Sequence, residues 1–147
     1  MKEFKGRVIA KGAFIGEAKV THEGFNTLAS FQKSALLNKK EVKVSDQNNK
    51  ELYGENITNK ILCLPMTIGS TTGGLVIQTV CSMHINPRAF LFSEPIDSLA
   101  ASGIVLSKVW QNSDIICIDC LGKEFLDTVK QNDKIEIKED GTVIILD

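Results

Sequence analysis

The sequence predicts an α/β fold of the β/β/α type, in which a mixed sheet has helices packed on one side. Three observations lead to this prediction. The chain opens with short runs that alternate apolar and polar residues, and two units then follow in which a short apolar run precedes a segment of helical length. It closes with two alternating runs around Asp140-Gly141, which is the pattern of a β-hairpin.

The N-terminal part of the chain predicts strands followed by a polar segment. Residues 6–21, GRVIAKGAFIGEAKVT, indicate one or two strands with a turn or bulge near Gly12 or Gly16. Residues 22–31 predict a loop or a short strand with exposed aromatic side chains. Residues 32–59 are polar and rich in Lys and Asn, so we expect a solvated insertion in which EVKVSD could pair as an edge hairpin.

Two strand–helix units occupy the middle of the chain. Residues 60–66, KILCLPM, predict a short buried strand, and residues 73–84 have helical length. The apolar stripe expected on that helix consists of Leu75, Val76, Thr79, Val80 and Met83. Residues 88–93 predict a second buried strand, and residues 94–110 a helix with Pro95 in its first turn. Small residues that suit close helix packing follow at Ala100, Ala101 and Gly103.

Length and composition limit the classes of function. The chain has 147 residues, which suits one domain over 1–147, with the polar insertion at about 32–59. Its net charge of -1 gives no electrostatic case for binding nucleic acid or an anionic membrane. No apolar run approaches the roughly 20 residues of a membrane helix, and the N-terminus lacks the apolar region of a signal peptide. We therefore expect a cytoplasmic protein.

The four cysteines predict buried thiols. Cys117 and Cys120 have CxxC spacing, but the run DIICIDC is typical of a strand, and residues three apart on a strand face opposite sides. No second CxxC and no His pair at metal-ligand spacing accompany them. The residues after this strand, GKEFLDTVKQND, predict a short helical turn. We assign no metal ligand to this chain.

A glycine- and hydroxyl-rich loop is the strongest functional signal. It lies between the strand at 60–66 and the following helix and consists of Gly69, Ser70, Thr71, Thr72, Gly73 and Gly74. A helix N-terminus presents unpaired N–H groups and a partial positive charge, so an anion or carboxylate can bind there. The pattern does not match the P-loop, GxGxxG or GxSxG motifs. The alternative is that Ser70 or Thr71 simply caps the helix.

Four segments give the chain a resemblance to the small, swivel-domain subunit of the aconitase X family. They are LPMTIGSTTGG, NPRAFLFSEPIDSLAASGIVLSKVW, DIICIDCLG and NDKIEIKEDGTV. The resemblance covers Gly6 to about Thr21 and Lys60 to Val143, and the polar stretch between them does not obviously match. It implies a hydro-lyase made of two subunits, in which this chain is a swivelling β/β/α domain that closes over the active site.

The resemblance also implies roles for residues and partners. Ser70 matches the family's serine base, which removes the proton next to the substrate carboxylate. A larger catalytic subunit would carry the iron or iron–sulfur centre, since the four cysteines here lack the spacing of a cluster. Family members often have a basic residue shortly before the Gly-Ser pair, where this chain has Met66, Thr67 and Ile68. A serine alkoxide is scarce at pH 7, so what activates Ser70 is open.

Two substrates and two further classes of function are compatible with the sequence. The family dehydrates cis-3-hydroxy-L-proline or a phosphorylated mevalonate, and the lack of Arg or Lys in CLPMTIGSTTGG favours hydroxyproline. The alternatives of another class are a non-catalytic module that binds an anion and a structural domain without chemistry. The expected substrate-binding residues are Gly69, Thr71, Thr72, Gly73, Gly74 and Glu94. For Glu94 a helix cap, by it or by Ser93, is an equal alternative.

Overall fold

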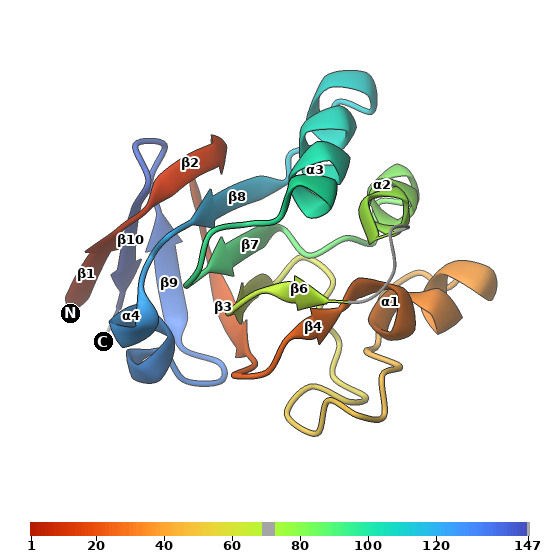
Figure 1. Ribbon diagram of the computed structural model, residues 1–147, viewed down its shortest axis with the longest axis horizontal. Coiled ribbons are helices and arrows are strands. Elements are labelled where there is room, and N and C mark those ends of the chain that lie inside the picture. The colour runs from red at the N-terminus through yellow and green to blue at the C-terminus, as the bar shows by residue number, and fades with distance from the viewer. Residues whose placement is uncertain (69–72, 147) are drawn as a thin grey trace.

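The computed structural model describes residues 1–68 and 73–146, and Figure 1 shows the arrangement of its elements. The strands are β1 (Lys2–Lys5), β2 (Arg7–Ala10), β3 (Phe14–Val20), β4 (Phe25–Asn26), β5 (Ile61–Leu64), β6 (Thr67–Ile68), β7 (Ala89–Phe92), β8 (Ile116–Asp119), β9 (Lys134–Ile137) and β10 (Thr142–Ile145). The helices are α1 (Thr27–Leu36), α2 (Gly73–Ser82), α3 (Ser98–Trp110) and α4 (Lys123–Thr128).

The main sheet is mixed and nearly closed. Its strand order is β1-β10-β9-β3-β5-β7-β8-β2, with β3, β5, β7 and β8 parallel and the remaining pairs antiparallel. The first and last strands of this order, β1 and β2, are joined by Gly6 alone. The two ends of the sheet must therefore meet, and the Gly6 N–H donates to the Gly141 carbonyl at this junction, 3.1 Å away.

The central strands are buried on both faces, as parallel strands normally are. Every residue of β5, β7 and β8 is buried. Alternate residues belong to two apolar clusters: Leu62, Phe90 and Cys117 face α1–α3, whereas Ile61, Leu91 and Ile116 face the inside of the curved sheet. Figure 1 shows α1, α2 and α3 gathered on one side of the strands, which confirms the predicted fold class.

The short helix α4 belongs to the second cluster. Its Phe125 and Leu126 pack with residues of the curved sheet, and Phe4 of β1 meets the Phe125 ring edge-on at a centroid distance of 5.4 Å. The predicted C-terminal hairpin is present as β9 and β10, and Gly141 has the positive φ of +92° that its turn requires. Over residues 1–68 and 73–146, no helix is long and apolar enough to cross a bilayer.

The face that α2 buries agrees only in part with the predicted stripe, since Val80 is buried and Val76 and Met83 pack against the first cluster, whereas Leu75 and Thr79 are exposed. Leu75 is 63 % exposed, and the buried side chains are Ile77, Val80 and Cys81. The reason is the contact between α2 and α3, because Gly74 lies directly against Gly103 and sets the rotation of α2 about its axis. The predicted close packing at Gly103 is thus present, and Leu75 turns outward.

Residues 22–59 contribute more to the core than the sequence predicts. The expected exposed aromatics, Phe25 and Phe31, are fully buried and meet edge-on, because residues 27–36 form α1. The polar insertion also anchors itself in the first cluster, through Val42, Val44, Leu52 and Ile57. Its expected hairpin is reduced to a single bridge between Lys43 and Asn56. Isolated apolar residues among many polar ones give no periodicity, so this anchoring could not be read from the sequence.

Candidate functional site at the glycine loop

The predicted loop lies between β6 and α2. Gly69, Ser70, Thr71 and Thr72 lie outside the described residues, so the structure does not test their roles. Gly73 and Gly74 open α2. The structure does describe the segments before and after the loop, and each is fixed to the rest of the fold.

The segment before the loop is held by α3. The Thr67 hydroxyl in β6 donates to the Asp97 carboxylate. Asp97 is also the N-cap of α3, where its Oδ2 accepts from the Ala100 N–H at 3.0 Å. This corrects the expected cap, since neither Ser93 nor Glu94 caps the helix. Because α3 begins three residues after Pro95, the proline precedes the helix rather than opening it.

The same segment is paired with the start of α1. β6 lies parallel to β4, with Phe25 opposite Thr67 and Asn26 opposite Ile68. Asn26 is the N-cap of α1, and its Oδ1 accepts from the Ala29 N–H at 3.0 Å. β6 therefore touches the N-terminal ends of both α1 and α3.

The segment after the loop is also packed on α3. A Cβ atom added to Gly74 would lie 2.4 Å from the Leu99 carbonyl oxygen, and one added to Gly103 would lie 2.4 Å from the Gly74 carbonyl oxygen. The backbones of the two helices are thus in direct contact, which only glycine permits here. None of α1, α2 and α3 has an acidic residue in its first turn. The N-termini of α1 and α3 contact β6, just before the loop, and α2 begins just after it. The N–H groups of α1 and α2 favour an anionic ligand, whereas the Asp97 carboxylate offsets the positive charge at the start of α3.

The corner after β7 joins the ends of three parallel strands. The Ser93 N–H donates to the Leu64 carbonyl at 3.0 Å, and the Ser93 carbonyl accepts from the Gly122 N–H at 2.9 Å. The Glu94 carbonyl accepts from the Cys120 N–H at 3.3 Å, while the Glu94 residue is exposed. The position of this corner, at the carboxyl ends of parallel strands, is where open sheets place ligands. Contact of Glu94 with the loop stays a prediction, since Ser70 is outside the described residues.

An ion pair that the sequence did not reveal braces this corner. The Asp119 side chain is 0 % exposed and accepts from Arg7 Nε at 2.9 Å, Arg7 Nη2 at 2.6 Å and the Ile96 N–H at 2.8 Å. Burial alone would raise the pKa of Asp119, but these hydrogen bonds and the Arg7 charge outweigh it and hold the pKa below its usual value. Arg7 and Asp119 are 112 residues apart, so no local pattern marks them as partners.

The thiols do not fit an iron–sulfur cluster. Cys63, Cys81 and Cys117 are buried, as predicted, and burial raises the pKa of each thiol, which disfavours the thiolate that iron would need. Cys120 is exposed, contrary to the prediction, because it follows β8 in a backbone conformation with φ of 58°. Among the described residues, no group of three or more His, Cys, Asp and Glu side chains could hold a metal ion.

A histidine–carboxylate pair lies at the end of β3. His22 Nδ1 is 2.7 Å from Glu51 Oε2, and Nε2 is 3.2 Å from the Leu126 carbonyl oxygen. Hydrogen bonding to Glu51 raises the pKa of His22 above its ordinary value, although partial burial opposes this. Burial would raise the pKa of Glu51, but bonds from the His22 N–H and ring and from Thr21 lower it. An imidazolium would satisfy both acceptors, so the pair links β3, the polar insertion and α4.

We expect this pair to make stability depend on pH. The folded pKa of His22 is raised, so its contribution is complete below the unfolded pKa of about 6.5 and is lost as pH rises through the folded pKa. The His22→Gln substitution should lower the unfolding free energy by more at pH 5.5 than at pH 8.5. The difference should stay below about 1 kcal/mol, because half of the His22 side chain is exposed to screening solvent. Urea denaturation at both pH values measures it, and equal losses would contradict the assignment.

Comparisons with known proteins agree with this geometry. The family model described as the aconitase X swivel domain matches residues 3–145. The phosphomevalonate dehydratase small subunit of Methanococcoides burtonii is 30% identical, over 96% of this chain and 93% of that protein. That of Archaeoglobus fulgidus is 25% identical, over 94% and 93%. The crystal structure of Thermococcus kodakaraensis aconitase X in its holo-form has a chain that superposes with a TM-score of 0.82 at 27% identity, over 100% of both chains.

These matches confirm three predictions made from the sequence: the family resemblance, the fold class, and a hydro-lyase of the dehydratase type. The family model spans residues 3–145, and these two relatives are each covered over 93% of their length. On this evidence the chain belongs to the aconitase X swivel-domain family.

Proposed function

We propose that this chain is the small subunit of a phosphomevalonate dehydratase, a two-subunit enzyme that removes water from a phosphorylated hydroxy acid. The observation that carries the proposal is similarity over 73% to 96% of this chain to four small subunits of that name. The geometry of the described residues supports it, because α2 begins directly after the loop at which an anionic substrate would bind and the N-terminus of α1 lies beside the segment before it.

The substrate is the point at which this proposal departs from the sequence-based preference. Hydroxyproline was favoured because no Arg or Lys lies in CLPMTIGSTTGG. Helix N-termini bind anions through N–H groups and need no basic side chain, so that absence does not argue against a phosphate. The larger subunit can also supply cations. cis-3-Hydroxy-L-proline is therefore the alternative substrate, with phosphomevalonate preferred.

We assign proton removal to Ser70. In the reaction the base takes the proton from the carbon next to the carboxylate, and the hydroxyl group leaves from the neighbouring carbon as water. The N-terminus of α2 and its glycine N–H groups would lower the pKa of the serine hydroxyl, and the N-terminus of α1 adds to the same field. Gly73, Gly74 and the hydroxyls of Thr71 and Thr72 are assigned to holding the carboxylate.

The iron centre is assigned to the larger subunit. The described residues of this chain offer no fitting set of ligands, as their buried thiols have raised pKa values. The chain alone should then lack dehydratase activity. Its cytoplasmic location, expected from the sequence, is likewise part of the proposal.

A surface for that subunit borders the loop. Four apolar side chains around it are about half exposed or more: Met66, Ile68, Leu75 and Leu99. Val8 of β2 and Ile15 of β3 are also exposed. Exposed apolar groups beside a polar site are typical of a surface that another protein covers. We expect an interface of roughly 1,600 Å² with the larger subunit.

Reconstitution tests the proposal. The chain should co-purify with its larger subunit in a complex that converts phosphomevalonate, but not hydroxyproline, with loss of one water, as followed by mass spectrometry. Each subunit assayed alone is the control and should be inactive. Turnover of hydroxyproline alone would establish the alternative substrate, and a chain that is monomeric and active by itself would refute the two-subunit proposal.

A further inference from the structure

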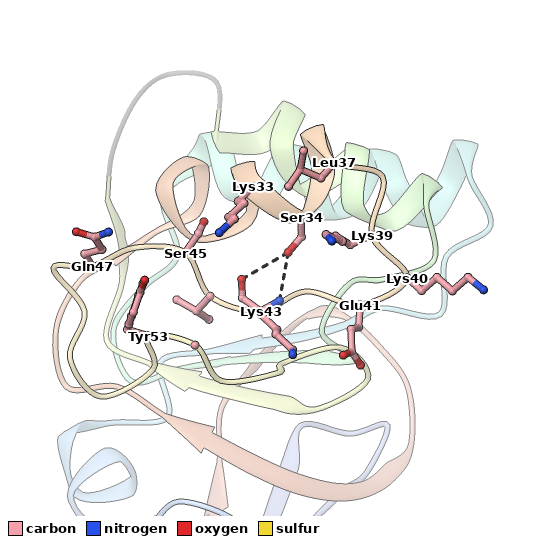
Figure 2. Close-up of a pocket in the computed structure, with 12 residues that line it drawn as sticks. Lys33, Ser34, Leu37, Lys39, Lys40, Glu41, Lys43, Ser45, Gln47 and Tyr53 are labelled. Carbon is pink, nitrogen blue, oxygen red and sulfur yellow. Dashed lines mark hydrogen bonds between the residues drawn. The ribbon is translucent and has the colours of Figure 1, made fainter.

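A basic cavity lies away from the glycine loop, between α1 and the polar insertion. Its volume is about 620 Å³, and Figure 2 shows the residues around it. They are Lys33, Ser34, Leu37, Lys39, Lys40, Glu41, Lys43, Val44, Ser45, Gln47, Tyr53 and Gly54. No lining residue comes from β6, α2 or α3, which hold the loop.

Positive charge around this cavity is not neutralised. The ammonium groups of Lys33, Lys39, Lys40 and Lys43 form no ion pair or hydrogen bond with any described residue. The one lining carboxylate, Glu41, accepts from Asn56 Nδ2 at 2.7 Å instead. In Figure 2, Lys33 extends from α1 toward Ser45, while Lys40 turns outward.

The lysines are not needed to cap α1. Its final carbonyls accept from backbone N–H groups: Lys33 from Leu37, Ser34 from Lys39, and Ala35 from Asn38, at 3.1, 3.0 and 3.3 Å. A helix C-terminus whose carbonyls are already bonded offers little to an ammonium group. The ammonium groups therefore stay available to a ligand.

The floor of the cavity is apolar and held in place. Leu37 and Tyr53 are more than half exposed over buried Val44. The Val44 backbone is fixed at both ends, by its N–H to the Glu55 carbonyl at 3.0 Å and by its carbonyl to the Gly54 N–H at 2.8 Å. Ser34 Oγ accepts from the Lys43 N–H at 3.2 Å, which joins the insertion to α1. The cavity is thus formed without a ligand.

We propose that this cavity binds a small organic anion that has an apolar body and a phosphate or carboxylate head group. Lys33, Lys39 and Lys43 hold the head group, and Leu37, Val44 and Tyr53 contact the body. A volume within roughly 300–1,000 Å³ is typical of small-molecule sites. This site lies beyond the proposed function, because it uses neither the loop nor the interface beside it.

Titration of the ¹⁵N-labelled full chain with hexyl phosphate tests the proposal. Amide signals of residues 33–54 should shift and saturate with a Kd of about 1 mM or tighter. Hexanoate should shift the same signals, inorganic phosphate should bind more weakly, and hexylamine should not bind. Added salt should weaken the hexyl phosphate response, since exposed charges are screened. Absence of saturable shifts, or equal shifts with hexylamine, would overturn the proposal.

Matched variants locate the contacts. Lys33→Gln/Lys43→Gln should weaken hexyl phosphate binding about tenfold, as loss of charge-assisted contacts implies. Lys50→Gln/Lys130→Gln removes the same charge from lysines outside the cavity and should leave Kd unchanged. Leu37→Ser should weaken binding, whereas Leu36→Ser, a neighbour that does not line the cavity, should not. If a cavity variant and its matched control lost the same affinity for hexyl phosphate, the site would be overturned. It would also be overturned if the amide signals of residues 33–54 shifted with the larger subunit but not with hexyl phosphate.

Discussion

Replacing Ser70 by alanine is expected to abolish turnover by the reconstituted complex while leaving substrate binding largely intact. As the proposed base, its hydroxyl acts mainly when the proton moves, whereas the carboxylate of bound substrate keeps the N–H groups of α2. Loss of a general base lowers the rate by about 10² to 10⁴-fold. Steady-state kinetics should show this loss in kcat, with a much smaller change in KM.

The neighbouring hydroxyls provide the control for Ser70. Thr71→Ala and Thr72→Ala should raise KM and leave kcat nearly unchanged, if these groups only hold the substrate. Iron content and subunit assembly must match wild type in every variant. A Ser70→Ala complex that keeps more than about a tenth of wild-type kcat falls short of the general-base range, and Ser70 would then be a helix cap.

Replacing Gly103 by a larger residue should destabilise the fold and impair the site together. A Cβ atom there would lie 2.4 Å from the Gly74 carbonyl oxygen and 2.6 Å from the Gly74 Cα, both backbone atoms that have no rotamer to change. We expect Gly103→Ala to lower the unfolding free energy by about 1–3 kcal/mol, the usual cost of overpacking. Gly103→Leu should cost more, and both should raise KM because the start of α2 is displaced.

The direction of this effect separates packing from helix propensity. At an open helical position, replacing Gly by Ala stabilises by about 1 kcal/mol. Ser102→Ala, at the exposed adjacent position, is the control and should be nearly neutral in denaturant unfolding. If Gly103→Ala stabilised the chain, α2 and α3 would not be in backbone contact.

Much of the fold could be predicted because its signals are local. The buried strands at β5, β7 and β8 are short apolar runs, and the hairpin of β9 and β10 is marked by Asp140-Gly141. The predicted order of strand, loop and helix likewise locates the glycine loop directly before α2. The role of Ser70 came from the family resemblance, and it stays a prediction.

What the sequence could not show depends on tertiary contacts. The buried face of α2 is set by Gly74 meeting Gly103, 29 positions apart, so periodicity within the helix places Leu75 in the buried stripe although it is exposed. The sequence does not single out Asp97 as the cap because Ser93 is also a capping type, and only the backbone shows where α3 begins. The Arg7–Asp119 pair and the basic cavity join distant segments in the same way.

The contacts of α3 have a consequence for how this region could change during evolution. Asp97, before its first turn, holds β6 on one side of the loop, and Gly103, in its second turn, holds the start of α2 on the other. Both boundaries of the loop are therefore positioned by one short stretch of a single helix. Mutations that shift this stretch act on both boundaries at once, while β4 continues to hold β6. Mutations in α3 could thus change how the loop meets a partner surface or substrate without any change in the loop sequence.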